Sequence, residues 1–117
     1  MDRQHGTWGE RVRTFKTDNC LVTILYLKAN KRCSWHKHST AYNQFFVIKG
    51  KLGVRTNIGP EQETDTAIVE EGQSFIVKPG IHHEFITYDE PTTIEEVAYV
   101  KYDESDILRT RLGGDTN

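Results

Sequence analysis

Short stretches rich in β-branched and aromatic residues, separated by turn residues, constrain the fold of this chain most. The clearest is Cys20–Leu27 (Cys-Leu-Val-Thr-Ile-Leu-Tyr-Leu), which is typical of a buried strand. Asp18-Asn19, Gly59-Pro60 and Asp89-Glu90-Pro91 are turn signals between such stretches. No stretch shows a long helical period. Together these features predict an all-β sandwich or barrel.

The same pattern predicts the secondary structure of most of the remaining chain. Further strands are expected over residues 11–16, 33–38, 42–48, 52–56, 66–69, 74–77, 83–88 and 93–102. Residues 103–109 are expected to form one helical turn. Residues 1–9 are interpreted as an N-terminal arm and residues 110–117 as a polar tail, so residues 1–117 are expected to form a single domain.

Composition limits the classes of function. With 117 residues, 36% of them hydrophobic, the chain is expected to form one domain with a modest core. A net charge of −2 does not favour nucleic-acid binding, and we expect no membrane span and no signal peptide. Two cysteines in this setting predict free thiols in a reducing cytoplasm. So small a core, with Val97 and Tyr99 expected on the outside of the last strand, predicts a homodimer.

Four of the five histidines lie in two short segments. His36 and His38 are one residue apart, and on a strand such residues point to the same face. The second segment ends in His82-His83 and follows the turn Pro79-Gly80. Buried imidazole rings need a hydrogen-bond partner or a metal, so this clustering is the main functional signal.

The two histidine segments resemble the motifs of the cupin superfamily, whose fold is a small jelly-roll barrel. The first motif is a His-x-His pair, an acidic residue and a glycine six residues after that acid. Here His36 and His38 form the pair, Gly50 is the glycine, and Gln44 stands in place of the acid, after a longer gap than usual. In the second motif His83 occupies the ligand position, three residues after a glycine.

The resemblance implies a metal site formed by His36, His38, Gln44 and His83. On the expected strand Gln44 shares a face with Phe46 and Ile48, which predicts that it points into the barrel. Three imidazoles and an amide oxygen leave open positions for water or substrate, as a working metal site requires. Such ligands suit a divalent transition metal: Zn, Mn, Fe, Ni or Cu. The alternative is a barrel whose histidines hydrogen-bond only to one another and to water.

A closer resemblance runs along the whole chain. Trp8-Gly9, Phe46–Gly50, Ile94–Val97 and Tyr102–Arg109 are similar to the type II mannose-6-phosphate isomerase cupin domain. The set of three histidines and a glutamine is also similar to small cupins that linearise unsaturated uronates in pectin and alginate breakdown.

Glu96 is the candidate for proton transfer. It shares a strand face with Ile94, Ala98 and Val100, which predicts an acid among apolar residues inside the barrel. If Glu95, Val97 and Tyr99 point inward instead, Glu96 is merely solvated. His82 is expected at the surface because it alternates with His83. His5 is expected to be solvated, and Cys33 to be an ordinary core thiol rather than a zinc ligand.

These features predict a metal-binding cupin that acts as an isomerase on a sugar or sugar phosphate. One alternative is a cupin dioxygenase with a three-histidine iron site. The other is a sugar-binding or sensor module without catalysis. Fold alone does not choose between them.

Overall fold

Nine β-strands, and no helix, make up the part of the chain that the computed structural model describes, residues 2–59 and 63–100. Over those residues no helix is long and apolar enough to span a bilayer. The all-β class is confirmed. The strands are β1 (Asp2–Gly6), β2 (Gly9–Lys16), β3 (Cys20–Leu27), β4 (Tyr42–Lys49), β5 (Lys51–Asn57), β6 (Thr64–Glu70), β7 (Ser74–Val77), β8 (His83–Thr87) and β9 (Thr92–Tyr99).

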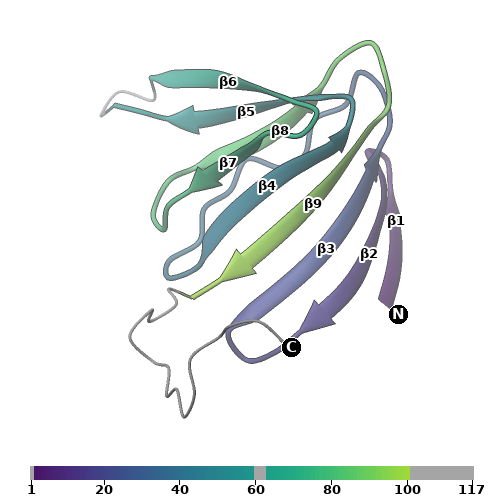
Figure 1. Cartoon of the computed structure of the whole chain (residues 1–117). Coiled ribbons are helices and arrows are strands. Elements are labelled where there is room, and N and C mark those ends of the chain that lie inside the picture. Colours follow the sequence, from purple (N-terminus) through teal and green to yellow (C-terminus); the bar gives the residue numbers. More distant parts are fainter. Residues whose placement is uncertain (1, 60–62, 101–117) are drawn as a thin grey trace, which may run out of the picture.

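The strands form two antiparallel sheets. The larger has the order β1-β2-β3-β9-β4-β7 and the smaller has the order β6-β5-β8. Figure 1 shows β5, β6 and β8 as a layer beside β4 and β7, while β9, β3, β2 and β1 extend the larger sheet away from it. This is the expected jelly-roll architecture, although the two sheets are not joined by hydrogen bonds into a closed ring of named strands.

The core lies between the two sheets. Phe45 of β4 and Phe85 of β8 meet edge to face, with ring centroids 4.3 Å apart and ring planes at 79°. The other members of this core are apolar side chains of β3 to β9: Leu25, Leu27, Val47, Leu52, Val54, Val69, Val77 and Ile94. Removing these side chains from water stabilises the sandwich by about 25 cal/mol for each Å² of apolar surface buried.

Two motif glycines lie in turns, Gly80 near the histidines and Gly50 at the other end of β4. Gly50, which joins β4 to β5, has a φ of +98°, and a Cβ atom there would meet the Thr92 hydroxyl. Gly80 has a φ of +82°, and its N–H donates to the carbonyl of His38 over 2.7 Å. Side chains rarely tolerate such φ values, so these two motif positions favour glycine.

The termini differ from the sequence-based expectation where they are described. Residues 2–6 of the expected arm form the edge strand β1, paired with β2 from Asp2↔Arg13 to Gly6↔Gly9. The last strand ends at Tyr99 rather than at residue 102. The helical turn over 103–109 and the tail over 110–117 lie outside the described residues.

The strand expected over residues 33–38 is also not formed. The segment instead makes one isolated bridge to β8, His36↔His83, and a second bridge to β8, Arg32↔Ile86, lies just before it. Thr87 donates its N–H to Lys31, and Cys33 donates to Phe85. The segment is therefore held along β8, but without a continuous ladder.

Candidate metal centre

Backbone hydrogen bonds bring the two histidine segments together. The N–H of His36 donates to the His83 carbonyl over 3.0 Å, and the N–H of His83 donates to the His36 carbonyl over 2.8 Å. The hydrogen bond from the Gly80 N–H to the His38 carbonyl holds the turn between β7 and β8 against the segment that carries His38. His36 and His38 thus sit in the connection before β4, and His83 is the first residue of β8.

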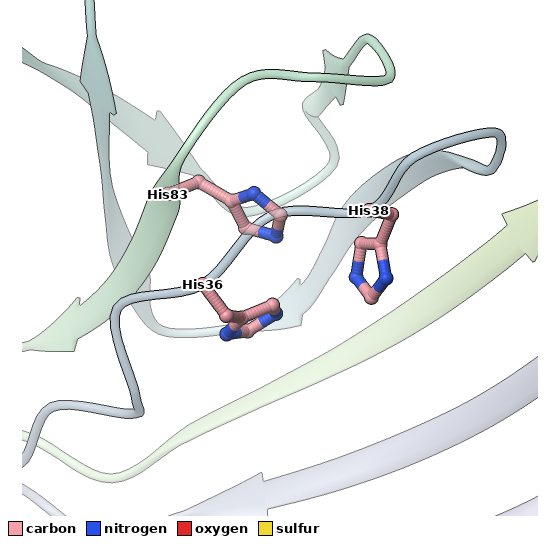
Figure 2. A group of neighbouring side chains, drawn as sticks. All are labelled: His36, His38 and His83. Carbon is pink, nitrogen blue, oxygen red and sulfur yellow. The ribbon is translucent and has the colours of Figure 1, made fainter.

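The three imidazole rings converge, as Figure 2 shows. The ring centroids are 4.5 Å apart for His36 and His83, 5.1 Å for His36 and His38, and 5.6 Å for His38 and His83. One ring nitrogen from each residue lies within 4.8 Å of the other two. His36, His38 and His83 are therefore close enough to share one metal ion.

The free ring nitrogens fit a metal ion. The Nδ1 atoms of His83 and His36 lie 3.0 and 2.9 Å from the carbonyl oxygens of Ile81 and Ser34. A carbonyl only accepts, so each Nδ1 carries the proton and each Nε2 keeps its lone pair. The Nε2 atoms of His38 and His83 are buried and lack a hydrogen-bond partner within residues 2–59 and 63–100. A metal would satisfy them, and carbonyl-anchored imidazoles are typical of metal ligands.

The electrostatic environment keeps two of the rings neutral. Burial lowers the pKa of His38, and the nearby His36 lowers it further. Burial also lowers the pKa of His83, against the hydrogen bond to Ile81 that raises it. A lowered pKa favours the neutral imidazole at neutral pH, and the neutral ring is the form that binds a metal.

Gln44 does not point into the barrel, and the face predicted for it was wrong. In β4 the buried residues are Asn43, Phe45 and Val47, whereas Phe46 and Ile48 are 39% and 44% exposed. Gln44 alternates with the buried set and lies on the outer face. Both faces of this strand carry large apolar side chains, so hydrophobicity did not reveal which of them is inside.

Gln44→Glu is accordingly expected to leave metal affinity unchanged. A carboxylate on the outer face is too far from the ion to add attraction that survives screening by water and salt. Metal titration of the variant and the wild type by calorimetry tests this. A tighter binding constant in the variant would place residue 44 among the ligands.

A cavity of about 620 Å³ opens beside the histidines. Its lining includes His36, His38, Asn43 and Glu96. Asn43 lies on the inner face of β4 and donates from Nδ2 to Glu96 Oε2 over 3.3 Å. If Phe45 and Val47 are taken as the inward residues of this strand, instead of Phe46, the alternation places Asn43 on the inner face.

Glu96 lies on the inner face, with Ala98 beside it in the cavity wall. Burial raises the pKa of its carboxyl. The hydrogen bond from Asn43 and the charges of His36, Arg11 and Arg13 act in the opposite direction. A carboxyl whose pKa is raised by burial and lowered by its neighbours is suited to exchange a proton with a ligand in the cavity.

Both cysteines are free thiols, and Cys33 lies outside the histidine group. Cys33 packs against the core and lines the cavity. Burial, with the carboxylates of Glu96 and Glu84 adding repulsion, raises its pKa to about 12.

Cys33 is expected to react slowly with iodoacetamide in the folded protein. A pKa of about 12 leaves almost no thiolate near pH 8, roughly a thousandfold less than an ordinary cysteine has. Mass spectrometry of Cys33 peptides after timed alkylation, with and without urea, measures the difference. Equal rates in both conditions would contradict the buried neutral thiol.

The remaining histidines lie apart from the centre. His82 stacks on Trp35, with ring centroids 5.8 Å apart and planes at 13°. The guanidinium of Arg55 lies 5.3 Å from the Trp35 ring and pairs with Glu84 at 2.5 Å. The contact between Trp35 and His82 connects the segment that carries His36 to the segment that carries His83, outside the three-histidine group. His5 is exposed on β1, as expected.

The sequence profile of the family described as "Cupin domain" matches residues 23–97. This chain is a cupin. The match covers more than half of the chain and includes both histidine segments. The expected superfamily is therefore confirmed. The closer resemblance to the mannose-6-phosphate isomerase domain is not confirmed.

Solved structures share the fold of this cupin at low sequence identity. KdgF from Halomonas sp. matches with a TM-score of 0.70 and 13% identity, over 89% of this chain and 90% of that one. The Cnp3 cupin domain of Schizosaccharomyces pombe matches with 0.69 and 15%, over 79% and 64%. CapF from Staphylococcus aureus, described as a capsular polysaccharide assembling protein, matches with 0.75 and 18%, over 89% of this chain but 30% of CapF. No curated protein sequence matches the chain.

Proposed function

We propose that this cupin is a metal-dependent isomerase of a sugar or sugar derivative. The observation that carries the proposal is a group of three histidines beside a cavity that Glu96 lines. Two of these histidines have buried Nε2 atoms without a hydrogen-bond partner in the described part of the chain. Ligand atoms, open space and a proton-transfer group are what isomerisation of a hydroxy-carbonyl compound requires.

His36, His38 and His83 would hold the ion through Nε2. Since all three ligands are neutral, a bound divalent ion would keep its full charge and supply Lewis acidity toward a hydroxyl or carbonyl oxygen. Glu96 would take a proton from the hydroxyl-bearing carbon and return it to the neighbouring carbonyl carbon, while the hydroxyl proton passes to the former carbonyl oxygen. Asn43 would hold the Glu96 carboxyl in place through its amide N–H. Substrate and product have the same atoms, because one proton moves between the two carbons and one between the two oxygens.

Metal analysis followed by a turnover panel tests the function. We expect one transition-metal ion per chain in purified protein, and isomerisation of at least one sugar or sugar phosphate that stops when a chelator removes the ion. Oxygen uptake with bound iron would replace this proposal with the dioxygenase alternative. No turnover of any sugar by the metal-loaded protein would replace it with a binding module.

The homodimer stays a prediction. Val97 lies on the strand face opposite Ala98 and Glu96, which line the cavity, so contact through that face would leave the site accessible. Sedimentation velocity at micromolar protein is expected to give a species of twice the chain mass. A single monomer peak under those conditions would contradict it.

A further inference from the structure

The side-chain amide of Asn43 is only half used within the described protein. Its Nδ2 donates to Glu96 Oε2 over 3.3 Å. Its Oδ1 is buried and has no hydrogen-bond partner in residues 2–59 and 63–100. Buried amide oxygens are normally paired, because an unpaired one has lost its contact with water without replacing it. The Asn43 oxygen is therefore an open acceptor.

Strand packing directs this acceptor toward the cavity. Asn43 lies on the inner face of β4, between Ala98 of β9 and Val77 of β7. It is 2% exposed and lines the cavity of about 620 Å³ beside the histidines. Because neighbouring strands close off both sides of this position, a partner for Oδ1 would approach through the cavity.

The contact with Glu96 sets the chemistry of that partner. A carboxylate accepts hydrogen bonds and does not donate them, so the nitrogen of the amide is the atom that faces Glu96 Oε2. The oxygen of the amide then remains an acceptor, and only a group that carries a hydrogen atom satisfies it. Among the groups of a sugar, that group is a hydroxyl.

A rival use of Oδ1 is as an acceptor for Glu96 itself. A protonated carboxyl could donate its O–H to Oδ1 after a rotation of the amide, with no ligand involved. In the structure the amide has the opposite orientation, with Nδ2 toward Glu96. The two uses also make different predictions, because the rival requires no particular hydroxyl on the ligand.

We propose that Asn43 is a specificity-determining residue whose Oδ1 accepts a hydrogen bond from one ligand hydroxyl. Since the same amide donates to Glu96, that hydroxyl would lie near the carbon on which Glu96 acts. When a sugar isomerises between its first and second carbons, the oxygens on both carbons react. The hydroxyl left for Asn43 is then the one on the third carbon. The inference rests on the proposed function, because it assigns a substrate contact in the same site.

Calorimetry of the purified protein tests the inference without turnover. The probes are glucose, galactose and glucose 6-phosphate, each compared with its 3-deoxy and 4-deoxy derivatives. We expect the 3-deoxy form of the best-binding probe to bind at least about tenfold more weakly than its parent, because it leaves Oδ1 unpaired. The 4-deoxy form is expected to bind like the parent. An equal loss for both deoxy forms, no loss for the 3-deoxy form, or no binding of any probe would overturn the inference.

Substitutions assign the preference to Asn43. Asn43→Leu removes the acceptor but keeps a side chain of similar size, so the parent sugar and its 3-deoxy form are expected to bind equally. Gln44→Leu is the matched control, because it removes an amide from the next residue of β4, on the outer face. We expect the preference for the 3-hydroxyl to persist in that control. A preference that survives in Asn43→Leu would show that the amide serves Glu96 alone.

The outcome is separable from that of the proposed function. A preference for the 3-hydroxyl that Asn43→Leu abolishes, without turnover of any sugar, would support this contact and contradict the isomerase. Turnover of a sugar without such a preference would do the reverse. If Asn43→Leu fails to fold, judged by circular dichroism, the comparison of parent and deoxy probes in the wild type still decides.

Discussion

His83→Ala is expected to abolish stoichiometric metal binding, with affinity at least roughly 100-fold weaker, the upper end of what loss of a supporting partner alone costs. His83 is 1% exposed, its Nδ1 lies 3.0 Å from the Ile81 carbonyl oxygen, and its Nε2 has no hydrogen-bond partner among the described residues. Removing it leaves two ligands, and two imidazoles do not complete a site. Metal content by mass spectrometry of the purified variant measures the loss, and His36→Ala is expected to behave alike.

His82→Ala is the matched control for this prediction. His82 is next in sequence, but it stacks on Trp35 outside the three-histidine group, so we expect the metal to be retained. Circular dichroism of each variant separates loss of the ligand from loss of the fold. One ion per chain in a folded His36→Ala/His83→Ala double variant would remove the assigned centre.

Glu96→Gln is expected to lower turnover by about a hundredfold to ten-thousandfold, the usual contribution of a positioned acid or base. The amide has nearly the same shape and its oxygen can still accept from Asn43 Nδ2, so the cavity keeps its structure. What it loses is the ability to take up and return a proton. Steady-state rates on the best substrate from the turnover panel, with metal content measured in parallel, test this.

Glu95→Gln provides the control, because Glu95 lies on the opposite face of β9 and does not line the cavity. Its turnover is expected to match the wild type. Unchanged turnover in Glu96→Gln with metal retained would remove Glu96 from the mechanism. Loss of metal in that variant would instead assign it a structural role at the centre.

Local sequence determined most of the strands. Cys20–Leu27 and Ser74–Val77 were predicted with the bounds that β3 and β7 have. These stretches are rich in β-branched and aromatic residues and are bounded by turn residues, so a strand is favoured without help from distant contacts. Residues 33–38 lack such support, and only their bonds to β8 decide their conformation.

The edge strand β1, by contrast, was not predicted from local sequence. Residues 2–6 are polar, and nothing in their pattern separates a strand from an arm. Their strand conformation follows from backbone pairing with β2, which satisfies N–H and C=O groups whatever the side chains are. β2 begins only three residues after β1 ends, but such backbone pairing does not require a particular side-chain pattern, so composition did not reveal it.

The sequence by itself, through the resemblance of its two motifs to those of cupins, predicted the family and the proximity of His36, His38 and His83. Only the tertiary structure decided what surrounds them. Asn43 rather than Gln44 faces the cavity, since alternation defines two faces of β4 but not which of them is buried. Likewise, Arg11 and Arg13 flank the buried Val12 in an alternating strand, where the polar side chains are expected to face solvent. Their entry into the cavity depends on the register of β2 on β3 and of β3 on β9, which is set by contacts across the whole sheet.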